Sequence, residues 1–524
     1  MAYTSPMKSD GWLAEQVASF QADSYPGFLR KRMVEPDKTA LIFEGRSLSY
    51  CELHDAIELT ARKMIGHHGL RRGDRVVINM ENSDRMIICY LAVLAAGAVA
   101  VPINPKLVER EVRFILSDAT PKLYLADADK AETAKAFAGE YNTTIEDASV
   151  LLGRPVDEGV AIPPAIPDDP ASIFYTSGTT GAPKGVIHTH TTLKHGAFQC
   201  AVGWVHDFPH TALAVTPFFH IAAHGWFYPI WIYNGTLVVD TFKTERCFEL
   251  IERHRIQSFN GVPAMLLMMA SSDHRHKYDL SSITNVCFGA SPMPPEKLAA
   301  VQDLFPNAAF WHGYGQTEAH GTICVLPADL AFTKNGSVGF TVPSCEVRIV
   351  DEQDIDVPQG EHGEVTARGP QIMVGYLNRP EATAETLAGG WLHTGDLGYV
   401  DEDGCIYLVD RKKDMIIRGG ENVYSVEIEN LLITHEALQG CAVIGMPHPL
   451  LGEQICAALV LRNPDKADLG DLTAELTALC RRELAHFKVP EMWKVVDSLP
   501  TTATGKIQKA ILRAELLAAA EAVK

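Results

Sequence analysis

An uninterrupted apolar run of 18 residues, from position 86 to position 103, sets the strongest constraint on how this chain folds. Its length matches that of a membrane-spanning helix. Gly97 and Pro102 lie inside the run and argue against a single continuous helix. The run instead predicts a buried helix over residues 87–96, followed by a buried strand over residues 98–101. A strand that is apolar at every position is typical of a parallel sheet covered by helices on both faces.

Strand-like and helix-like segments alternate along the chain. Strands are expected over residues 75–80, 213–216, 237–239 and 285–288, and helices over residues 110–117, 247–253 and 295–304. A last, alanine-rich helix is expected over residues 511–523. This alternation, without any repeat of fixed period, predicts an α/β protein.

A chain of 524 residues is too long for one hydrophobic core, so more than one domain is expected. The best boundary is the charge run D-R-K-K-D at residues 410–414, which separates two apolar strands at 405–409 and 415–417. We therefore expect a large domain over residues 1–412 and a small one over residues 413–524.

Charge and cysteine content narrow the classes of function. The formal net charge of -19 disfavours nucleic acid as a partner, so any phosphate ligand must be held by a local group of donors. The 11 cysteines include no C-x-x-C pair, which favours a reducing compartment. With no apolar stretch suited to a signal peptide near Met1 and no transmembrane segment, a cytoplasmic location is expected.

The segment Y-T-S-G-T-T-G-A-P-K-G at residues 175–185 is the most informative for function. Its three glycines permit tight turns that expose backbone amides, its hydroxyl side chains add donors, and Lys184 adds charge. Such a loop can wrap a polyphosphate. It lacks the spacing of a Walker A loop, so a P-loop fold is disfavoured. An exposed Gly/Ser/Thr turn is the alternative.

A second segment, W-H-G-Y-G-Q-T-E at residues 311–318, combines aromatic rings, two glycines, a hydroxyl and a carboxylate. These groups suit nucleotide stacking, phosphate contact and a magnesium ligand, because Mg²⁺ prefers oxygen donors. Taken alone, the segment could also be a turn before a buried strand. Its position after the phosphate loop favours the functional interpretation.

In this order the motifs resemble the adenylate-forming superfamily, which includes acyl-CoA synthetases, the adenylation domains of peptide synthetases and beetle luciferases. The resemblance extends over about residues 39–509. It implies a large N-terminal domain of layered sheets and helices with a small β-barrel-like part, and a small, mobile α+β C-terminal domain. It also implies a nucleotide site, whose expected members are Thr176, Ser177, Gly178, Thr179, Thr180, Gly181, Lys184, Ala290, Ser291, His312, Gly313, Tyr314, Gly315, Gln316, Thr317, Asp396 and Arg411.

The resemblance further assigns particular roles. Asp396 and Arg411 would bind the ribose, while Thr176 and Glu318 would hold Mg²⁺. The expected catalytic residues are Lys506, His220, Thr317 and Glu318. Lys506 is the candidate cation that bridges the acid and the α-phosphate, where negative charge accumulates in the transition state.

Two other interpretations of these residues fail because a required residue is missing. Ser291 is not the nucleophile of a hydrolase, because the motif G-x-S-x-G would need glycine where the chain has Met293. His220 and His224 have the i, i+4 spacing of zinc ligands, but Ile221 stands where a zinc protease has glutamate.

The C-terminal part is expected to serve the second half of the reaction. By resemblance it rotates about the hinge residue Lys413, and Gly419, Gly420, Glu421 and Lys488 bind coenzyme A. The acyl pocket would be lined by His220, Ile221, His224, Trp226, Ala290, His320 and Gly321. Bulky and polar members of that set favour a medium-chain fatty acid or an aromatic acid over a long alkyl chain.

The expected function is therefore that of an acyl-CoA synthetase. It would join a carboxylic acid to AMP with release of pyrophosphate and pass the acyl group to coenzyme A, which is favoured over a free carrier protein. The expected partners are the acid, ATP with Mg²⁺, and coenzyme A; a homodimer is compatible with the resemblance. Two alternatives stay open: a luciferase-like oxidative enzyme, and a catalytically inactive protein that binds acyl-nucleotides.

Overall fold

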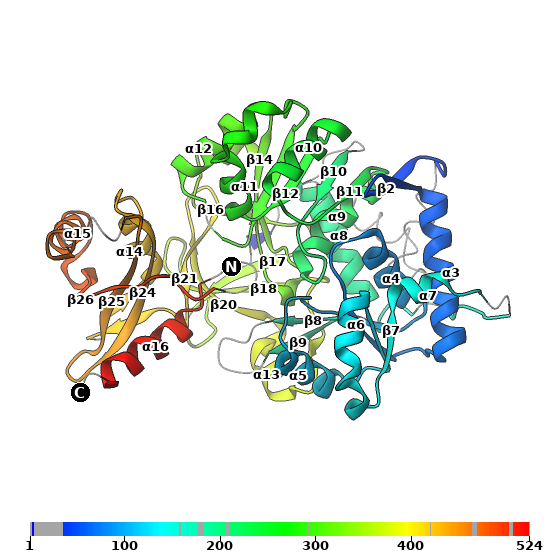
Figure 1. Ribbon diagram of the computed structural model, residues 1–524. Helices are drawn as coiled ribbons and strands as arrows, with labels where there is room; N and C mark the ends of the chain where they lie inside the picture. Colours follow the sequence, from blue (N-terminus) through cyan, green and yellow to red (C-terminus); the bar gives the residue numbers. More distant parts are fainter. Residues whose placement is uncertain are drawn as a thin grey trace.

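A computed structural model describes residues 3–4, 35–156, 159–164, 166–176, 183–204, 210–291, 293–419, 421–463, 469–501 and 507–522. These residues form a large N-terminal domain and a small C-terminal domain, which lie side by side in Figure 1. Within the described ranges, no helix has both the length and the apolar character needed to cross a bilayer.

The large domain is organised by a long path of paired strands whose two halves differ in direction. One half is parallel and consists, in spatial order, of β2 (Thr39–Phe43), β11 (Thr236–Val239), β10 (Thr211–Ala214), β12 (Ser258–Gly261), β13 (Asn285–Gly289) and β14 (Ala309–Tyr314). The direction changes at β15 (Cys324–Leu326), which is antiparallel to β14. In sheets of this kind, ligands bind beyond the carboxyl ends of the strands.

The other half is antiparallel and corresponds to the barrel-like part expected from the sequence. It consists of β16 (Ser337–Thr341), β21 (Ile406–Arg411), β20 (Leu392–Val400), β18 (Gly363–Arg368), β17 (Glu346–Val350) and β1 (Tyr3–Thr4). Because β16 pairs with both β15 and β21, the two halves form one continuous path.

A second sheet faces the first. Its order is β19 (Gly375–Tyr376), β9 (Lys184–Thr189), β8 (Pro170–Thr176), β5 (Val99–Pro102), β4 (Arg75–Asn79), β6 (Leu123–Ala126) and β7 (Thr144–Asp147). Strands β8, β5, β4, β6 and β7 run parallel to one another, whereas β9 is antiparallel to both β8 and β19.

Helices fill the space between the two sheets and cover their outer faces, as Figure 1 shows. The inner layer holds α3 (Tyr50–His68), α4 (Asp84–Ala95), α8 (His190–Trp204) and α9 (Ile221–Ile232). The outer layers hold α10 (Thr244–His254), α11 (Pro263–Ala270) and α12 (Pro295–Leu304) on the first sheet, and α5 (Glu109–Ala119) and α6 (Ala128–Lys135) on the second.

The apolar run that begins at residue 86 forms α4 and β5 in this core. Ser83 caps the helix by accepting a hydrogen bond from the N–H of Met86, and Gly97 turns the chain with a φ of 71°. All four residues of β5 are buried. The prediction of a buried helix followed by a buried strand is therefore confirmed.

The small domain has its own sheet, formed by β23 (Glu421–Val423), β22 (Ile416–Arg418), β25 (Gly452–Leu461) and β24 (Leu438–His448), with β26 (Met492–Val495) paired to β25. Helices α14 (Ser425–Leu432) and α15 (Leu469–Glu483) cover one face, and α16 (Lys509–Ala522) covers the other. This is the α+β unit expected at the C-terminal end.

The two domains meet at the start of α14. The hydroxyl of Ser425 donates to the carboxylate of Asp410 at 2.7 Å and accepts from the ammonium of Lys509 at 2.6 Å. The same ammonium lies 2.7 Å from Glu429. Residues from both sides of the predicted hinge, Lys413, thus contribute to one buried polar network.

A candidate nucleotide and acid site

Several of the predicted site residues lie where β13 and β14 end. Two glycines let these strands approach closely there. Gly289 pairs with Gly313, and a Cβ on Gly289 would lie 2.4 Å from the carbonyl oxygen of Gly313. A side chain there would displace backbone. The residue after the pair, Ala290, is exposed and has a φ of 72°, a left-handed conformation that L-residues rarely adopt. Ser291 follows it at the surface.

His312 is fixed just before this glycine pair. Its ring stacks on Phe288 at 4.9 Å between centroids with an interplanar angle of 10°, and its Nδ1 lies 3.2 Å from the carbonyl oxygen of Ser337. Burial lowers the pKa of His312 to about 4. The ring is therefore neutral at pH 7, and the carbonyl partner assigns its proton to Nδ1.

Tyr314, Asp396 and Arg411 form a polar triad from three different strands, in which Tyr314 and Asp396 are buried and the side chain of Arg411 is 40% exposed. The hydroxyl of Tyr314 donates to Oδ2 of Asp396 at 2.6 Å, and Nε of Arg411 lies 3.1 Å from Oδ1. Asp396 and Arg411 are direct partners in the pairing of β20 with β21. Burial and the charge of Asp396 raise the pKa of Tyr314, so its hydroxyl remains a donor.

The segment after Tyr314 is held in a tight turn by its own backbone. The carbonyl oxygen of Gln316 accepts hydrogen bonds from the N–H groups of Ala319 and Gly321, at 3.0 and 2.9 Å. A Cβ on Gly315 would lie 2.5 Å from the carbonyl oxygen of Gly321. The turn, η3 (Thr317–Ala319), carries the predicted catalytic residues Thr317 and Glu318.

His188 holds this turn from the neighbouring sheet. Its Nε2 lies 2.8 Å from the carbonyl oxygen of Thr317, and its Nδ1 lies 3.0 Å from the hydroxyl of Thr192. Burial lowers the pKa of His188 to about 4, so the neutral ring donates through Nε2 and accepts through Nδ1. No local sequence pattern predicts this contact, because its partners are 129 residues apart.

The two predicted magnesium ligands, Thr176 and Glu318, are connected through Lys184 and Tyr376. The hydroxyl of Thr176 donates to the carbonyl oxygen of Lys184 at 3.4 Å, and the ammonium of Lys184 lies 4.9 Å from the centroid of the Tyr376 ring. The hydroxyl of Tyr376 donates to Oε1 of Glu318 at 2.7 Å. A hydroxyl and a carboxylate are oxygen donors that suit Mg²⁺, which usually takes one or two carboxylates together with phosphate oxygens and water.

The phosphate loop starts and ends in paired strands. Thr176 and Lys184 are partners in the antiparallel pairing of β8 with β9. Ser177, Gly178, Thr179, Thr180 and Gly181 lie outside the described residues. The pairing brings the hydroxyl of Thr176 and the charge of Lys184 to the same end of the hairpin.

The predicted acyl-pocket residues gather around the start of α9, at different depths. His220 is half-buried and caps the helix by accepting from the N–H of Ala222 at 3.2 Å. The next position, Ile221, is buried, and a Cβ on Gly321 would lie 3.8 Å from the Cα of Ala222. His220, Gly321 and the exposed Ala290 are therefore the members closest to solvent.

The other members lie behind them. Trp226 is buried, and His224 is fully buried, with its Nε2 2.8 Å from the carbonyl oxygen of Phe218 and its ring packed against Tyr90 and Phe174. His320 is also fully buried, with its ring edge-on to that of His188. Burial lowers the pKa of both histidines, so they add neutral, flat surfaces to this region.

The predicted residues of the C-terminal domain are only partly described. Lys506 and Gly420 lie outside the described residues. Gly419 has a φ of 61° and donates its N–H to the carbonyl oxygen of Leu451 at 2.8 Å, while Glu421 is exposed on β23. Lys488 pairs with Glu427 at 2.6 Å, and the side chain of Lys413 lies 3.8 Å from Asp414.

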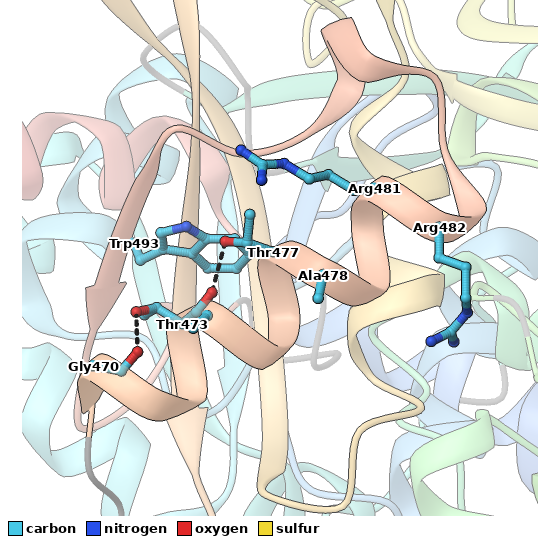
Figure 2. A pocket seen from close by; sticks show the side chains of 8 residues that line it. Gly470, Thr473, Thr477, Ala478, Arg481, Arg482 and Trp493 are labelled. Atoms are coloured by element: carbon cyan, nitrogen blue, oxygen red, sulfur yellow. Dashed lines mark hydrogen bonds between the residues drawn. The ribbon is translucent and has the colours of Figure 1, made fainter.

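A hollow of about 710 Å³ lies in the small domain, away from these residues. Figure 2 shows Trp493 lying along the face of α15 that carries Gly470, Thr473 and Thr477, with Arg481 and Arg482 near the end of the helix. Helix α15 lies at the far side of the small domain in Figure 1, whereas the triad belongs to the large sheet. The hollow is therefore separate from the predicted nucleotide site.

Comparison with known proteins identifies the family. The family of AMP-binding enzymes matches residues 28–377, and its C-terminal domain matches residues 427–506. A feruloyl-CoA synthase from Amycolatopsis sp is 36% identical over 493 residues, covering 93% of this chain and 97% of that protein. A long-chain-fatty-acid–CoA ligase from Bacillus subtilis (strain 168) is 34% identical over 519 residues, covering 90% of each.

A solved relative shares the fold over nearly its whole length. The o-succinylbenzoate CoA synthetase from Bacillus subtilis, in complex with its acyl-adenylate intermediate, has a TM-score of 0.84 and 30% identity, covering 93% of this chain and 97% of that one. The same synthetase in complex with ATP and a magnesium ion has a TM-score of 0.83 and 31% identity, covering 92% and 98%.

The chain therefore belongs to the AMP-binding, adenylate-forming enzyme family. Within that family it is an acid–thiol ligase.

The close approach of β13 and β14 gives a first prediction. Gly289→Ala should lower the free energy of unfolding by about 1–3 kcal/mol, because the added methyl group meets the backbone of Gly313. It should also weaken ATP binding, since Tyr314 directly follows Gly313 on β14 and would be displaced with it. Gly139→Ala is the matched control, because a Cβ there meets no atom within 4 Å. Denaturant unfolding measures both variants, and equal stability would contradict the tight packing described here.

Proposed function

We propose that this enzyme activates a small carboxylic acid as its acyl-adenylate and then transfers the acyl group to coenzyme A. The observation that carries the proposal is the polar triad Tyr314–Asp396–Arg411, together with Glu318 four positions after Tyr314. The triad supplies an aromatic face, a carboxylate and a cation, the groups that an adenosine with a ribose diol would use.

In this proposal the ribose of ATP binds at Asp396. A carboxylate has about four lone-pair sites, so it can accept from both ribose hydroxyls while keeping Tyr314 as a donor. Arg411 pairs with this carboxylate and adds donors of its own. The adenine would lie along Tyr314, beside the turn at Ala290 and Ser291, with His312 and Gly313 behind it.

The phosphates would extend from there toward Thr317 and the loop that starts at Thr176. Glu318 and Thr176 are the proposed ligands of Mg²⁺, and Lys184 supplies a further cation at the end of the hairpin. When bound, Mg²⁺ neutralises phosphate charge, which favours attack on the α-phosphorus. The chain's own residues then have to orient the acid and the triphosphate toward each other.

The first half-reaction joins two anions and needs a cation between them. The carboxylate oxygen of the acid attacks the α-phosphorus, a P–O bond forms, and pyrophosphate leaves with the electrons of the broken P–O bond. Lys506 is proposed to bridge the acid and the α-phosphate where charge accumulates. The half-buried His220 at the start of α9 would lie beside the reacting carboxylate.

The second half-reaction requires a different arrangement, since the thiol must reach the acyl carbon. We propose that the small domain, residues 413–524, rotates about Lys413. The rotation would move Lys506 away from the acyl-adenylate and bring in the segment that contains Gly419, Gly420 and Glu421. The thiolate of coenzyme A then attacks the acyl carbon and AMP leaves. Lys488, which pairs with Glu427 in the structure described here, is the proposed cation for the phosphates of coenzyme A.

The acid is proposed to be a medium-chain fatty acid or an aromatic acid. Trp226, His224 and His320 bring bulky, flat side chains to the region behind His220, which limits its depth. The relatives named above are ligases for feruloyl, long-chain fatty and o-succinylbenzoyl groups. Because these acyl groups differ in size and shape, the acid used by this chain has to be identified by a direct experiment.

A substrate screen is that experiment. Purified protein with ATP, Mg²⁺ and a library of acids should release pyrophosphate and AMP, and should form thioester only when coenzyme A is added. We expect aromatic or medium-chain acids to give the highest kcat/KM. A folded protein that binds no nucleotide would overturn the proposal.

The role of Asp396 is testable with a modified nucleotide. Asp396→Asn should weaken ATP binding by about tenfold or more, because a hydrogen bond to a charged group contributes about 1.5–3 kcal/mol. The wild type should discriminate against 2′,3′-dideoxy-ATP by a similar factor. In the variant the discrimination should collapse, because the removed group and the missing hydroxyls belong to the same contact. Unchanged discrimination would remove Asp396 from the ribose site.

The two half-reactions should separate by mutation. Lys506→Ala should lower acid-dependent ATP/pyrophosphate exchange by about 10²–10³-fold, as loss of an electrostatic donor does, yet still make thioester from preformed acyl-AMP. Lys413→Pro should do the reverse, because proline fixes the backbone φ at the hinge. Lys494→Ala, at an exposed lysine of β26, is the control. Loss of both half-reactions in folded Lys506→Ala would contradict the assignment.

A further inference from the structure

Tyr376 lies at the meeting point of the phosphate loop and the turn that carries Glu318. It is the second residue of the short strand β19 and pairs with Val186 of β9. Its ring is buried to 8% exposure and packs with Val186 and Met373 in a small apolar cluster. Its N–H donates to the hydroxyl of Thr383 at 2.9 Å. Backbone, ring and neighbours therefore hold this side chain in one position.

The hydroxyl of Tyr376 is directed at one oxygen of a carboxylate. It donates to Oε1 of Glu318 at 2.7 Å. The N–H of Met373 also donates to the carbonyl oxygen of Glu318 at 2.8 Å. Side chain and main chain of Glu318 are thus held by the same segment.

The face of the Tyr376 ring carries a second contact. The ammonium of Lys184 lies 4.9 Å from the ring centroid, within the range of a cation–π interaction. Lys184 begins β9 at the end of the phosphate loop. One tyrosine therefore contacts a cation of the loop with its ring and a carboxylate of the neighbouring turn with its hydroxyl.

We propose that Tyr376 is a positioning residue for magnesium-bound ATP: it restrains the Glu318 carboxylate, whose Oε2 would be left for the metal, and it restrains Lys184 at the end of the phosphate loop. This inference rests on the proposed function. A ligating carboxylate that is itself hydrogen-bonded loses less rotational freedom on binding its metal, and removing such a partner costs about 10–100-fold in metal affinity.

Calorimetry on the full-length protein with ATP alone and with ATP plus Mg²⁺ tests the proposal. In Tyr376→Phe the ring contact to Lys184 remains and only the hydroxyl is lost. Its affinity for ATP in EDTA should therefore stay within about twofold of wild type, while the gain in affinity that Mg²⁺ gives should shrink by about 10–100-fold. Tyr376→Leu also removes the ring, and should weaken ATP binding in EDTA as well.

Tyr278→Phe is the matched control, since it removes a tyrosine–glutamate hydrogen bond to Glu245 of 3.3 Å in an exposed part of the large domain. It should behave like wild type. Equal Mg²⁺ gains for wild type and folded Tyr376→Phe would overturn the inference alone. Absence of any Mg²⁺-dependent ATP binding in the wild type would overturn the inference and the proposed function together.

Discussion

The carboxylate of Asp396 connects the two halves of the large sheet, and the geometry of the site depends on that connection. Tyr314 reaches it from the last parallel strand, and Arg411 reaches it from the antiparallel half. Asp396 is 6% exposed, so its charge is offset by these partners and not by water. Because Glu318 follows Tyr314 after one tight turn, the position of the predicted metal ligand is tied to the same contact.

A strongly acidic chain can bind a triphosphate only if its cations are concentrated locally. The net charge of -19 repels anions at long range, but that repulsion is screened beyond about 8–10 Å at physiological ionic strength. Within that distance, Lys184 on the Tyr376 ring and Arg411 beside Asp396 are held by specific contacts. The restrained geometry of these side chains, and not the total charge, decides what the site attracts.

Much of the fold could be predicted because most helices and strands follow from the pattern of apolar and polar residues in short segments. The helix expected over residues 295–304 coincides with α12, and the strand expected over 285–288 is β13 less its final glycine. The motif residues Tyr314 and Glu318 also stand out locally, through their glycines and charges. Tyr376 and His188 do not, because their partners are 58 and 129 residues away and are set by strand pairing. A sequence alone does not contain that register.

The charge run predicted as the domain boundary is more structured than an open linker. The N–H of Lys412 donates to Gly395 on β20, and the N–H groups of Asp414 and Met415 both donate to Arg411, so the chain makes a tight turn around Lys413. Asp410 precedes that turn, whereas its partner Ser425 follows it. A rotation about Lys413, as proposed, must therefore separate Asp410 from Ser425. Each hydrogen bond lost costs about 1 kcal/mol when water replaces the partner. That cost is large enough to favour one orientation and small enough for a bound substrate to reverse it.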